Sequence, residues 1–402
     1  MENKQGFWKG VAAGALAVLL LGTAIYFLLP FLPAKRAVNF SHIEKLRKLE
    51  EIIDDNYLGD IDKDQLADGM YMGLVAGLAD PYSRYYTKEQ YEEANSRIQG
   101  EYVGIGVVLQ QDKDGTVSFA ECYEDSSAAE AGILVGDVLL RVDQMEVAGQ
   151  SLSEISEIIK NTKEDHVLLT VQREGEKEPL EIQVQVRNIE MTAVTHQMLE
   201  QKVGYIRIKS FTHVAPVQYQ AAVEDLKEQG MERLIVDLRD NTGGLLDAVC
   251  DILNEILPKG LIVYTEDKYG NRTEKESTGD HTLGVPLAVL VNKNSASASE
   301  IFAGAVQDHQ AGTVVGTVTY GKGVVQTTKV FGDGSALKLT ISHYYTPNGN
   351  DINGVGIKPD EEIELSKEAS EKWERGEELT MEEDAQLARA FAIVKENGNG
   401  TK

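Results

Sequence analysis

Hydrophobic positions follow different periods along this chain, and the changes of period divide it into segments. Between residues 40 and 98 apolar side chains recur every three or four positions, as at Ile43, Leu46 and Leu49, which is the spacing of one helix face. From 99 to 187 short apolar runs are separated by glycine-rich turns, and LEIQVQV near the end alternates with period two, as strands do. We therefore expect a helical N-terminal region over 40–98 and a small β domain over 99–187.

Shorter signals place a few boundaries inside these segments. The residues DPYS at 80–83 predict a turn. The sequence TKEQ, beginning at Thr87, predicts the start of a helix. A second, amphipathic helix is expected from Ser151 to Lys160.

Residues 188–365 have a third character, in which strand-like runs alternate with helical stretches. Strands are expected at VGYIRIKSF, RLIVDLRD, PLAVLVN, GTVVGT and ALKLTISHYYT, with helices over 216–229, 245–256 and 298–308. This alternation indicates strands crossed over by helices, an α/β core. The acid-rich residues 366–402 predict a helical C-terminal tail. The fold class is therefore a multidomain α/β or α+β protein.

The longest apolar run, residues 10–32, contains no charged side chain. As a helix it would be roughly 35 Å long, enough to cross a hydrocarbon core of about 30 Å. A cleaved signal peptide is the alternative, but the run is long for one and no A-x-A site follows it. We expect residues 1–39 to form a cytoplasmic tip and a transmembrane helix. The rest of the chain would then lie on the extracytoplasmic side of the cell membrane.

Charge and cysteine content exclude several classes of function. Acidic residues number 65 and basic residues 39, giving a net charge of −26, which argues against nucleic acid as a partner and against electrostatic binding to anionic lipid. The two cysteines, Cys122 and Cys250, have no metal-binding spacing, and HExxH is absent. No metal and no cofactor are expected.

The β domain resembles a PDZ domain of bacterial type, because AGILVGDVLL follows a strand that contains GIG. The glycines would let Val103, Gly104, Ile105 and Gly106 aim backbone N–H groups at one point, as an anion nest does. Such a nest suits the C-terminal carboxylate of a peptide, which would then add as a strand beside GIGVV. A glycine-rich turn in any small β domain is the simpler reading of GxG alone.

Three short segments of the α/β core each join a strand to small residues: LRDNTGG at 238–244, NSASASEIF at 294–302 and YGKGVVQ at 320–326. Each has an ordinary structural explanation. The first is a helix entry with close-packing glycines. In the second, Ser297-x-x-Glu300 is a capping box. In the third, a lysine in a hairpin would point at water.

Taken together, the three segments predict nucleophilic chemistry. Serine is a poor nucleophile until a base takes its proton, yet none of the seven histidines lies in a triad-like motif and GxSxG is absent. Lysine can serve as the base where burial disfavours its charged form. Lys322, between two glycines, could be buried in that way. Gln326 lies four residues on, and positions i and i+4 of a strand share a face.

As a set, these motifs and the preceding PDZ-like domain resemble the carboxyl-terminal processing peptidases, or tail-specific proteases. The resemblance covers most of residues 42–362. It implies that Ser297 is the nucleophile, that Lys322 is the general base and that Gln326 supports the lysine. It also implies an oxyanion hole made by the N–H groups of Gly243 and Ala298. The neighbouring serines of SASASE are expected to pack or hydrogen-bond locally.

The resemblance implies a membrane-anchored serine endopeptidase that binds the C-terminal tails of proteins through its PDZ domain and cleaves them through an acyl-enzyme. It also implies a homodimer that uses residues 40–97 and 366–402. The alternative from another class is a catalytically silent PDZ scaffold or regulatory binding protein, which predicts a missing catalytic residue. None is missing. A lipid- or acyl-binding body would explain the glycine turns but not Lys322.

Overall fold

The computed structural model describes residues 38–123, 126–162 and 165–398, together with Gly14, Leu16, Val18 and Thr23. The chain divides into two units, residues 1–73 and 74–402. The predicted membrane helix at 10–32 lies outside the described residues apart from those four. Among the helices that are described, none has both the length and the apolar character needed to cross a membrane.

From residue 38 onward, the first unit contains helices whose side chains remain accessible. Helix α2 (Phe40–Asn56) starts at the N-cap Asn39, and α3 (Lys63–Ala76) follows after a short loop. Neither helix contains a buried residue, and apolar side chains such as Leu49 and Ile52 are exposed. The helical periodicity predicted for this region is confirmed in α2 and α3.

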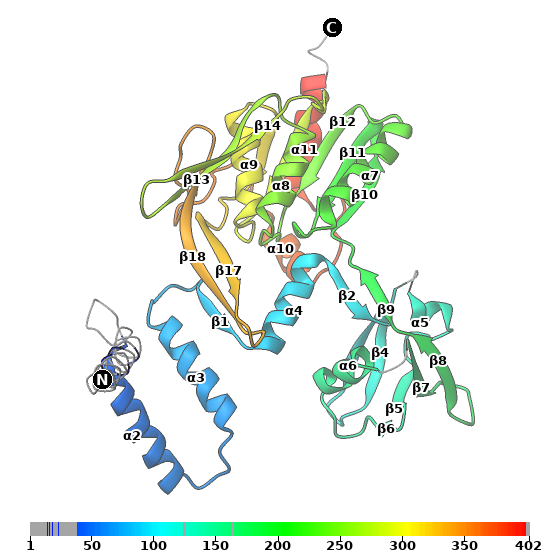
Figure 1. The fold of residues 1–402 in the computed structure, drawn as a ribbon. Helices are drawn as coiled ribbons and strands as arrows, with labels where there is room; N and C mark the ends of the chain where they lie inside the picture. The colour runs from blue at the N-terminus through cyan, green and yellow to red at the C-terminus, as the bar shows by residue number, and fades with distance from the viewer. Residues whose placement is uncertain are drawn as a thin grey trace, which may run out of the picture. The chain divides into compact units, whose positions relative to one another are not determined.

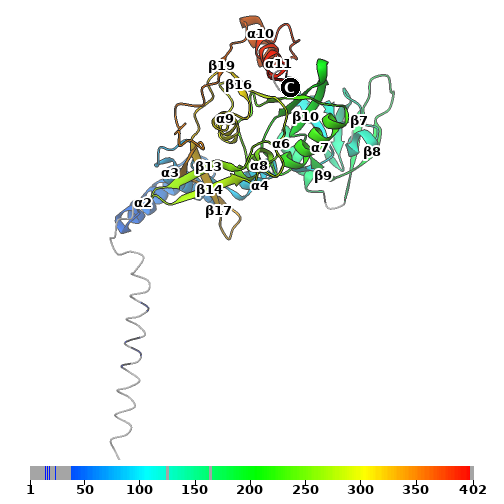
Figure 2. The same ribbon diagram turned by 90° about the horizontal axis from the view of Figure 1, so that it is seen from above.

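The second unit is built around a six-stranded sheet with helices on both faces (Figures 1 and 2). The first two strands of this sheet are antiparallel and every later neighbour is parallel. The strand order is β10 (Val194–Leu199), β11 (Val203–Ile208), β12 (Arg233–Asp237), β15 (Leu287–Val291), β16 (Thr313–Gly316) and β19 (Glu361–Glu362). The predicted crossover architecture is confirmed.

Helices cover both faces of this sheet, which is why its central strands are apolar throughout. All five residues of β15 are buried. One face packs against α7 (Ala215–Glu228), α8 (Leu246–Asn254) and α9 (Ala298–Asp308). The other face packs against α11 (Ala385–Gly398), whose Ala390, Ile393 and Val394 are buried in a separate cluster. The acidic C-terminal segment therefore supplies a layer of the core, with α10 (Lys367–Glu374) preceding α11.

A second sheet carries the segments that follow the lysine. Its strands are β1 (Arg84–Tyr86), β18 (Ala336–Tyr345), β13 (Gly260–Asp267) and β14 (Arg272–Ser277), with β17 (Val324–Val330) also paired to β18. Strand β1 lies inside the region predicted as helical, and its partner comes from the far end of the chain. Helix α4 (Lys88–Gln99) begins at the N-cap Thr87, as predicted.

The PDZ-like domain has its own sheet and its own core. A two-stranded ribbon of β2 (Glu101–Gly104) and β9 (Arg187–Glu190) joins it to the rest of the unit. Its other elements are β3 (Val107–Gln111), β4 (Val117–Cys122), α5 (Ser127–Glu130), β5 (Val138–Val142), β6 (Met145–Glu146), α6 (Leu152–Lys160), β7 (His166–Gln172) and β8 (Leu180–Gln185). Outside this domain, a short 3₁₀ helix (Glu200–Lys202) follows β10 of the six-stranded sheet.

Candidate active site

The three predicted segments meet because they follow neighbouring parallel strands. LRDNTGG follows β12, NSASASE follows β15, and YGKG lies beyond β16. Strand β15 pairs with β12 on one side and β16 on the other. The carboxyl ends of parallel strands share one edge of a sheet, where ligands of open α/β sheets commonly bind. The topology therefore brings together residues that are far apart in sequence.

Two serines of NSASASE bind the neighbouring loop. The Ser295 hydroxyl donates to Leu238 O at 2.8 Å, and the Ser299 hydroxyl donates to Asn241 O at 2.8 Å. Both serines are buried. The N–H of Ala296 also donates to Asn241 O, at 3.0 Å. The local hydrogen bonding expected of these serines is confirmed, and it fixes the serine turn against LRDNTGG.

Ser297 has a backbone conformation that is rare for a residue with a side chain. Its φ is 56° and its ψ is −113°, outside the usual allowed regions and typical of functional sites. It is the N-cap of α9, and its N–H donates to the Glu300 carboxylate at 2.8 Å. The carboxylate half of the predicted capping box is therefore present. The carbonyl oxygen of Ser297 accepts a hydrogen bond from the Tyr344 hydroxyl at 3.0 Å.

Lys322 is partly buried beside this turn. Burial lowers the pKa of its amine, and the nearby charge of Lys338 lowers it further, although Glu300 and Asp80 act in the opposite direction. A lowered pKa is what a lysine needs to act as a base. Its ammonium lies 5.0 Å from the centre of the Tyr82 ring. No hydrogen bond joins Lys322 Nζ to Ser297 Oγ in the part of the chain that the structure describes.

Gln326 lies on β17, but its amide is engaged elsewhere. Its Nε2 donates to Val324 O and to Thr340 Oγ1, both at 3.3 Å. Within the described residues, its side chain makes no hydrogen bond to Lys322. The predicted support of the lysine by Gln326 is therefore not formed in this conformation.

The two expected oxyanion donors differ in whether their N–H groups already have an acceptor. The N–H of Ala298 opens α9 and donates to no acceptor among the described residues, and a helix N-terminus favours negative charge. The N–H of Gly243 donates to the Asn241 side-chain oxygen at 2.8 Å. Asn241 is fully buried and its amide donates to Ile208 O at 2.9 Å. Of these two N–H groups, that of Ala298 has no acceptor among the described residues, and that of Gly243 already has one.

Gly243 lies too close to the serine turn to carry a side chain. Its φ is +106°, and an added Cβ would be 2.8 Å from Ala296 O and 2.9 Å from Ser297 Cβ. Alanine keeps the backbone N–H, but its Cβ would force that N–H away from the serine turn. We therefore expect Gly243→Ala to lower kcat/KM by about 10²–10³-fold, as the loss of an oxyanion donor does. Gly270→Ala is the matched control, because Gly270 also has positive φ (+81°) but has nothing within 4 Å. Equal loss of rate in both variants would contradict the assignment.

An open cavity of about 840 Å³ adjoins Lys322 and the serine turn. Its walls include three aromatic side chains, Tyr82, Tyr320 and Trp373, and the small residues Thr242 and Ala296. The cavity therefore extends from the reactive groups to α10. The wall also carries charged side chains, those of Arg239, Asp240, Lys293, Lys322, Glu364 and Glu374. The size of the cavity is sufficient for an extended peptide segment.

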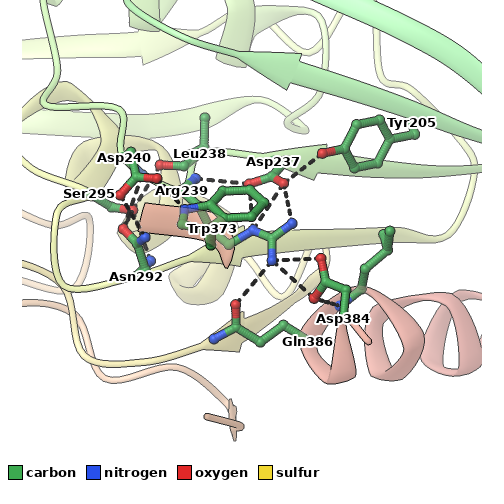
Figure 3. Close-up of polar contacts among 11 residues, drawn as sticks. Tyr205, Asp237, Leu238, Arg239, Asp240, Asn292, Ser295, Trp373, Asp384 and Gln386 are labelled. Carbon is green, nitrogen blue, oxygen red and sulfur yellow. Dashed lines mark hydrogen bonds and ion pairs between the residues drawn. The ribbon is translucent and has the colours of Figure 1, made fainter. Parts of the chain in front are cut away.

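A buried ionic network supports the loop that contains Gly243 (Figure 3). The guanidinium of Arg239 donates to Asp237, with bonds of 2.6–3.0 Å, and to Asp384 at 2.8 and 3.0 Å. The Tyr205 hydroxyl donates to Asp237 at 2.6 Å. Burial alone would raise the pKa of Asp237, but Arg239 outweighs it and holds that pKa below its ordinary value.

Trp373 connects the same loop to α10. Its ring lies 4.2 Å from the Arg239 guanidinium carbon and 4.7 Å from that of Arg207. Its indole N–H donates to the carboxylate of Asp240, which also accepts from Asn292 and Asn294. Sequence reasoning did not identify Trp373, Tyr82 or Asn241. The contact between LRDN and the tryptophan of the C-terminal segment joins residues that are far apart in sequence, so no local sequence pattern predicts it.

Metal chemistry has no support in the described residues, where no group of three or more histidine, cysteine, aspartate or glutamate side chains could hold an ion. His309 ends α9 at the opposite end from Ser297, and its ring bonds to Leu261 O at 2.7 Å. No histidine lines the cavity.

The residues predicted to bind a peptide carboxylate lie where β2 meets β3. Val103 and Gly104 belong to β2 and pair with β9, and Val103 is exposed. The carbonyl of Ile105 accepts from Ala128 N–H, so this residue is held by α5. Strand β3 is at the edge of its sheet, which leaves one side open to an added strand.

Comparison with known proteins supports three regions separately. The description "Peptidase family S41" matches residues 202–363, "PDZ domain" matches 119–173, and "Activating protease CtpB N-terminal domain" matches 33–90. A "Putative S41 protease" of Bacteroides fragilis, with 16% identity and a TM-score of 0.50, covers 86% of this chain and 94% of its own, which supports the fold alone.

Two curated relatives extend over most of the chain. A "Probable CtpA-like serine protease" of Staphylococcus aureus is 36% identical over 331 residues, covering 81% of this chain and 66% of its own length. A "Carboxy-terminal-processing protease" of Bartonella bacilliformis is 33% identical over 350 residues, covering 86% and 79%. The chain thus spans slightly less than two thirds of the Staphylococcus relative.

Proposed function

The chain belongs to peptidase family S41 and carries a PDZ domain, and from this premise we propose that it is a serine endopeptidase using a Ser297–Lys322 dyad. One observation carries the proposal. A serine with positive φ opens a helix and follows Ala296, which lines a peptide-sized cavity together with the partly buried Lys322.

The reaction would proceed by acyl transfer. Neutral Lys322 takes the proton of Ser297 as Oγ attacks the peptide carbonyl, and the resulting oxyanion is held by Ala298 N–H. The protonated lysine then donates to the leaving amine, and water hydrolyses the acyl-enzyme with Lys322 again as base. The step requires Lys322 to turn from the Tyr82 ring toward Ser297, and Gly243 N–H to leave Asn241.

Substrate recognition would use the PDZ domain. We propose that a protein's C-terminal carboxylate binds at residues 103–106 and that its chain adds beside the free edge of β3. Residues 103–106 run from the end of β2 into a bend at Gly106, where φ is +81°. Such a backbone can present N–H groups to one anion, and the edge strand supplies the ladder. The side chains at the cleavage site would be small or apolar.

The proposed function is tested with the full chain in detergent and two peptides of one sequence, one with a free C-terminal carboxylate and one with a C-terminal amide. The acid should be cleaved with a kcat/KM about tenfold higher, because it alone makes a charge-assisted bond worth about 1.4 kcal/mol. Equal rates would reject recognition of the tail. Turnover by Ser297→Ala would reject the nucleophile.

A catalytically silent scaffold is the second candidate, and one observation favours it. Lys322 and Gly243 both have other partners in this conformation. The two candidates differ in the reactivity of Ser297. A fluorophosphonate probe should label Ser297 in an enzyme whose Lys322 has turned toward the serine, and should label nothing in a scaffold.

Two further proposals concern location and assembly. We propose that residues 1–39 anchor the chain in the cell membrane with the catalytic unit outside, since residues 10–32 carry no charge. Release of the protein from membranes on deleting 1–39 would support it. We also propose that the exposed apolar faces of α2 and α3 mediate self-association. Light scattering that gives a monomer would reject it.

A further inference from the structure

Glu300 is buried without a cationic partner. Its exposed fraction is 0%, and no ion pair in the described chain includes it. A capping-box glutamate ordinarily bonds only to the N-cap amide and remains at the surface. A buried carboxylate needs compensation for the water that it loses. Its compensation here comes from two loops, one after β15 and one after β16.

Four donors converge on this one carboxylate. Oε2 accepts from the N–H of Ser297 and the N–H of Lys322, each at 2.8 Å. Oε1 accepts from the Thr319 hydroxyl and from Gly321 N–H, each at 2.6 Å. Three of these donors belong to the loop before β17, and the fourth belongs to the serine turn. One side chain therefore ties the backbone of the nucleophile to the backbone of the base.

The base loop is also held on its other side, so it has little freedom to adapt. The hydroxyl oxygen of Thr319 accepts from Ile357 N–H at 2.7 Å. Gly321 has a φ of +89°, and an added Cβ would be 3.0 Å from Val355 N. Tyr320 N–H donates to Ser295 O at 3.0 Å. Loss of the carboxylate would remove the acceptor of three backbone N–H groups, those of Ser297, Gly321 and Lys322.

We propose that Glu300 is a positioning residue of the dyad, which fixes the spacing between Ser297 and Lys322 through their backbone N–H groups. The inference rests on the proposed peptidase function for its catalytic consequence. Its structural part, the tie between two loops, stands independently. Charge-assisted bonds to backbone N–H groups are stronger than neutral ones, which suits a tie that must hold a strained serine.

The first variant is Glu300→Gln, which keeps the shape and removes the charge. An amide NH₂ must then face two donors, so at least one backbone N–H loses its acceptor. We expect kcat to fall about 100-fold with KM within about twofold, since a displacement near 1 Å of reacting groups has that cost. The charge of Glu300 raises the pKa of Lys322. Its removal should therefore shift the rising limb of the pH–rate profile to lower pH.

Two variants separate charge from geometry. Glu300→Asp keeps the charge but is one methylene too short to reach both loops, so kcat should fall without that shift to lower pH. Thr319→Val removes one of the four donors to Glu300 and also the acceptor of Ile357 N–H. It keeps the three backbone donors and should give a smaller fall, about tenfold or less, also without the shift. A residue that only stabilises the fold would lower the amount of folded enzyme in all three and leave the pH profile unchanged.

Hydrogen exchange of the full chain provides the readout that does not depend on activity. The amides of Ser297, Gly321 and Lys322 should be protected in the wild type and should exchange at least tenfold faster in Glu300→Gln, or in Thr319→Val if the former does not fold. Unchanged protection, or an unchanged kcat, would overturn the inference. If the wild type cleaves nothing but the exchange result holds, the proposed function fails and the tie remains.

Discussion

Methionine in place of Lys322 is expected to abolish peptide cleavage and, at neutral pH, to stabilise the fold. Removing a nucleophile or its base typically lowers kcat by roughly 10⁴–10⁶-fold. Ser297→Ala should lose as much and the double variant no more, because the two residues act as one unit. The measurement is the initial rate on the tailed peptide, with the Lys322→Arg variant included. Arginine stays protonated, so it should be as inactive as methionine.

The pH dependence follows from the direction of the lysine's pKa. Only the neutral amine can accept a proton, so the rate should rise with pH through the folded-state pKa of Lys322. That pKa lies below the ordinary 10.5 because burial, and then Lys338, disfavour the charge. An acid limb centred at or above 10.5 would contradict the proposed role of burial. Lys338→Met should move the limb to higher pH, since it removes a neighbouring positive charge.

The stability effect has the same origin. The unfolded chain holds the lysine proton more tightly than the folded chain, so burial of the charged amine costs stability at every pH below the folded pKa. The cost is lost as pH rises from that pKa to 10.5. Lys322→Met should therefore exceed the wild type in stability by an amount that shrinks with rising pH. Urea denaturation at about pH 6 and about pH 10 measures the difference.

The central strands were predicted well because the pattern that identifies each of them lies within its own residues. Strand β15 is buried on both faces, so it appears as an unbroken apolar run. Helix α9 begins at Ala298 and ends at Asp308, as predicted, because its capping serine and first apolar turn are adjacent in sequence. Where the whole sequence signal lies in one segment, the hydrophobic period and the capping residue were sufficient to predict the element.

Features made by two distant segments were not predicted. Strand β1 has only three residues, and its pairing with β18 is what makes it a strand. The acidic tail was recognised as helical, but nothing in its own pattern shows that Ala390 and Val394 pack on the sheet. Glu300 was identified only as a cap, because three of its four donors come from residues 319–322.

The candidate site divides in the same way. Residue types at Ser297, Lys322 and Ala298 could be assigned from motifs, and the topology brings their loops together. The conformation could not be assigned, because it depends on competing partners. Gly243 N–H has the nearby Asn241 oxygen as an acceptor, and Gln326 has Thr340. Hydrogen bonds of this kind have similar strengths, so sequence alone does not rank them.

Asparagine in place of Asp384 is expected to destabilise the protein by about 3–5 kcal/mol, a large share of the 5–15 kcal/mol typical of a folded domain. The carboxylate of Asp384 is 3% exposed and the side chain of Arg239 is 1% exposed, so water cannot replace the lost charge. Asparagine can still accept from Leu387 N–H, as Asp384 does at 2.9 Å, and the start of α11 should persist. Urea denaturation provides the measurement.

A control pair lies on the same C-terminal segment. Arg375 and Glu377 form an ion pair whose side chains are 57% and 49% exposed. Glu377→Gln should therefore cost less than about 1 kcal/mol. Equal effects of the two substitutions would show that the buried network contributes no more than a surface pair.

Asp384→Asn should also affect the candidate active site, because Arg239 immediately precedes the loop that carries Asn241 and Gly243. A guanidinium with fewer partners loses its fixed position against Trp373, whose indole holds Asp240. Cleavage by Asp384→Asn should therefore be slower than cleavage by the wild type even without urea and at a temperature where the variant is fully folded. Full activity of the folded variant would show that this network contributes only to stability. The position of the Gly243 loop would then depend on Asn241 alone.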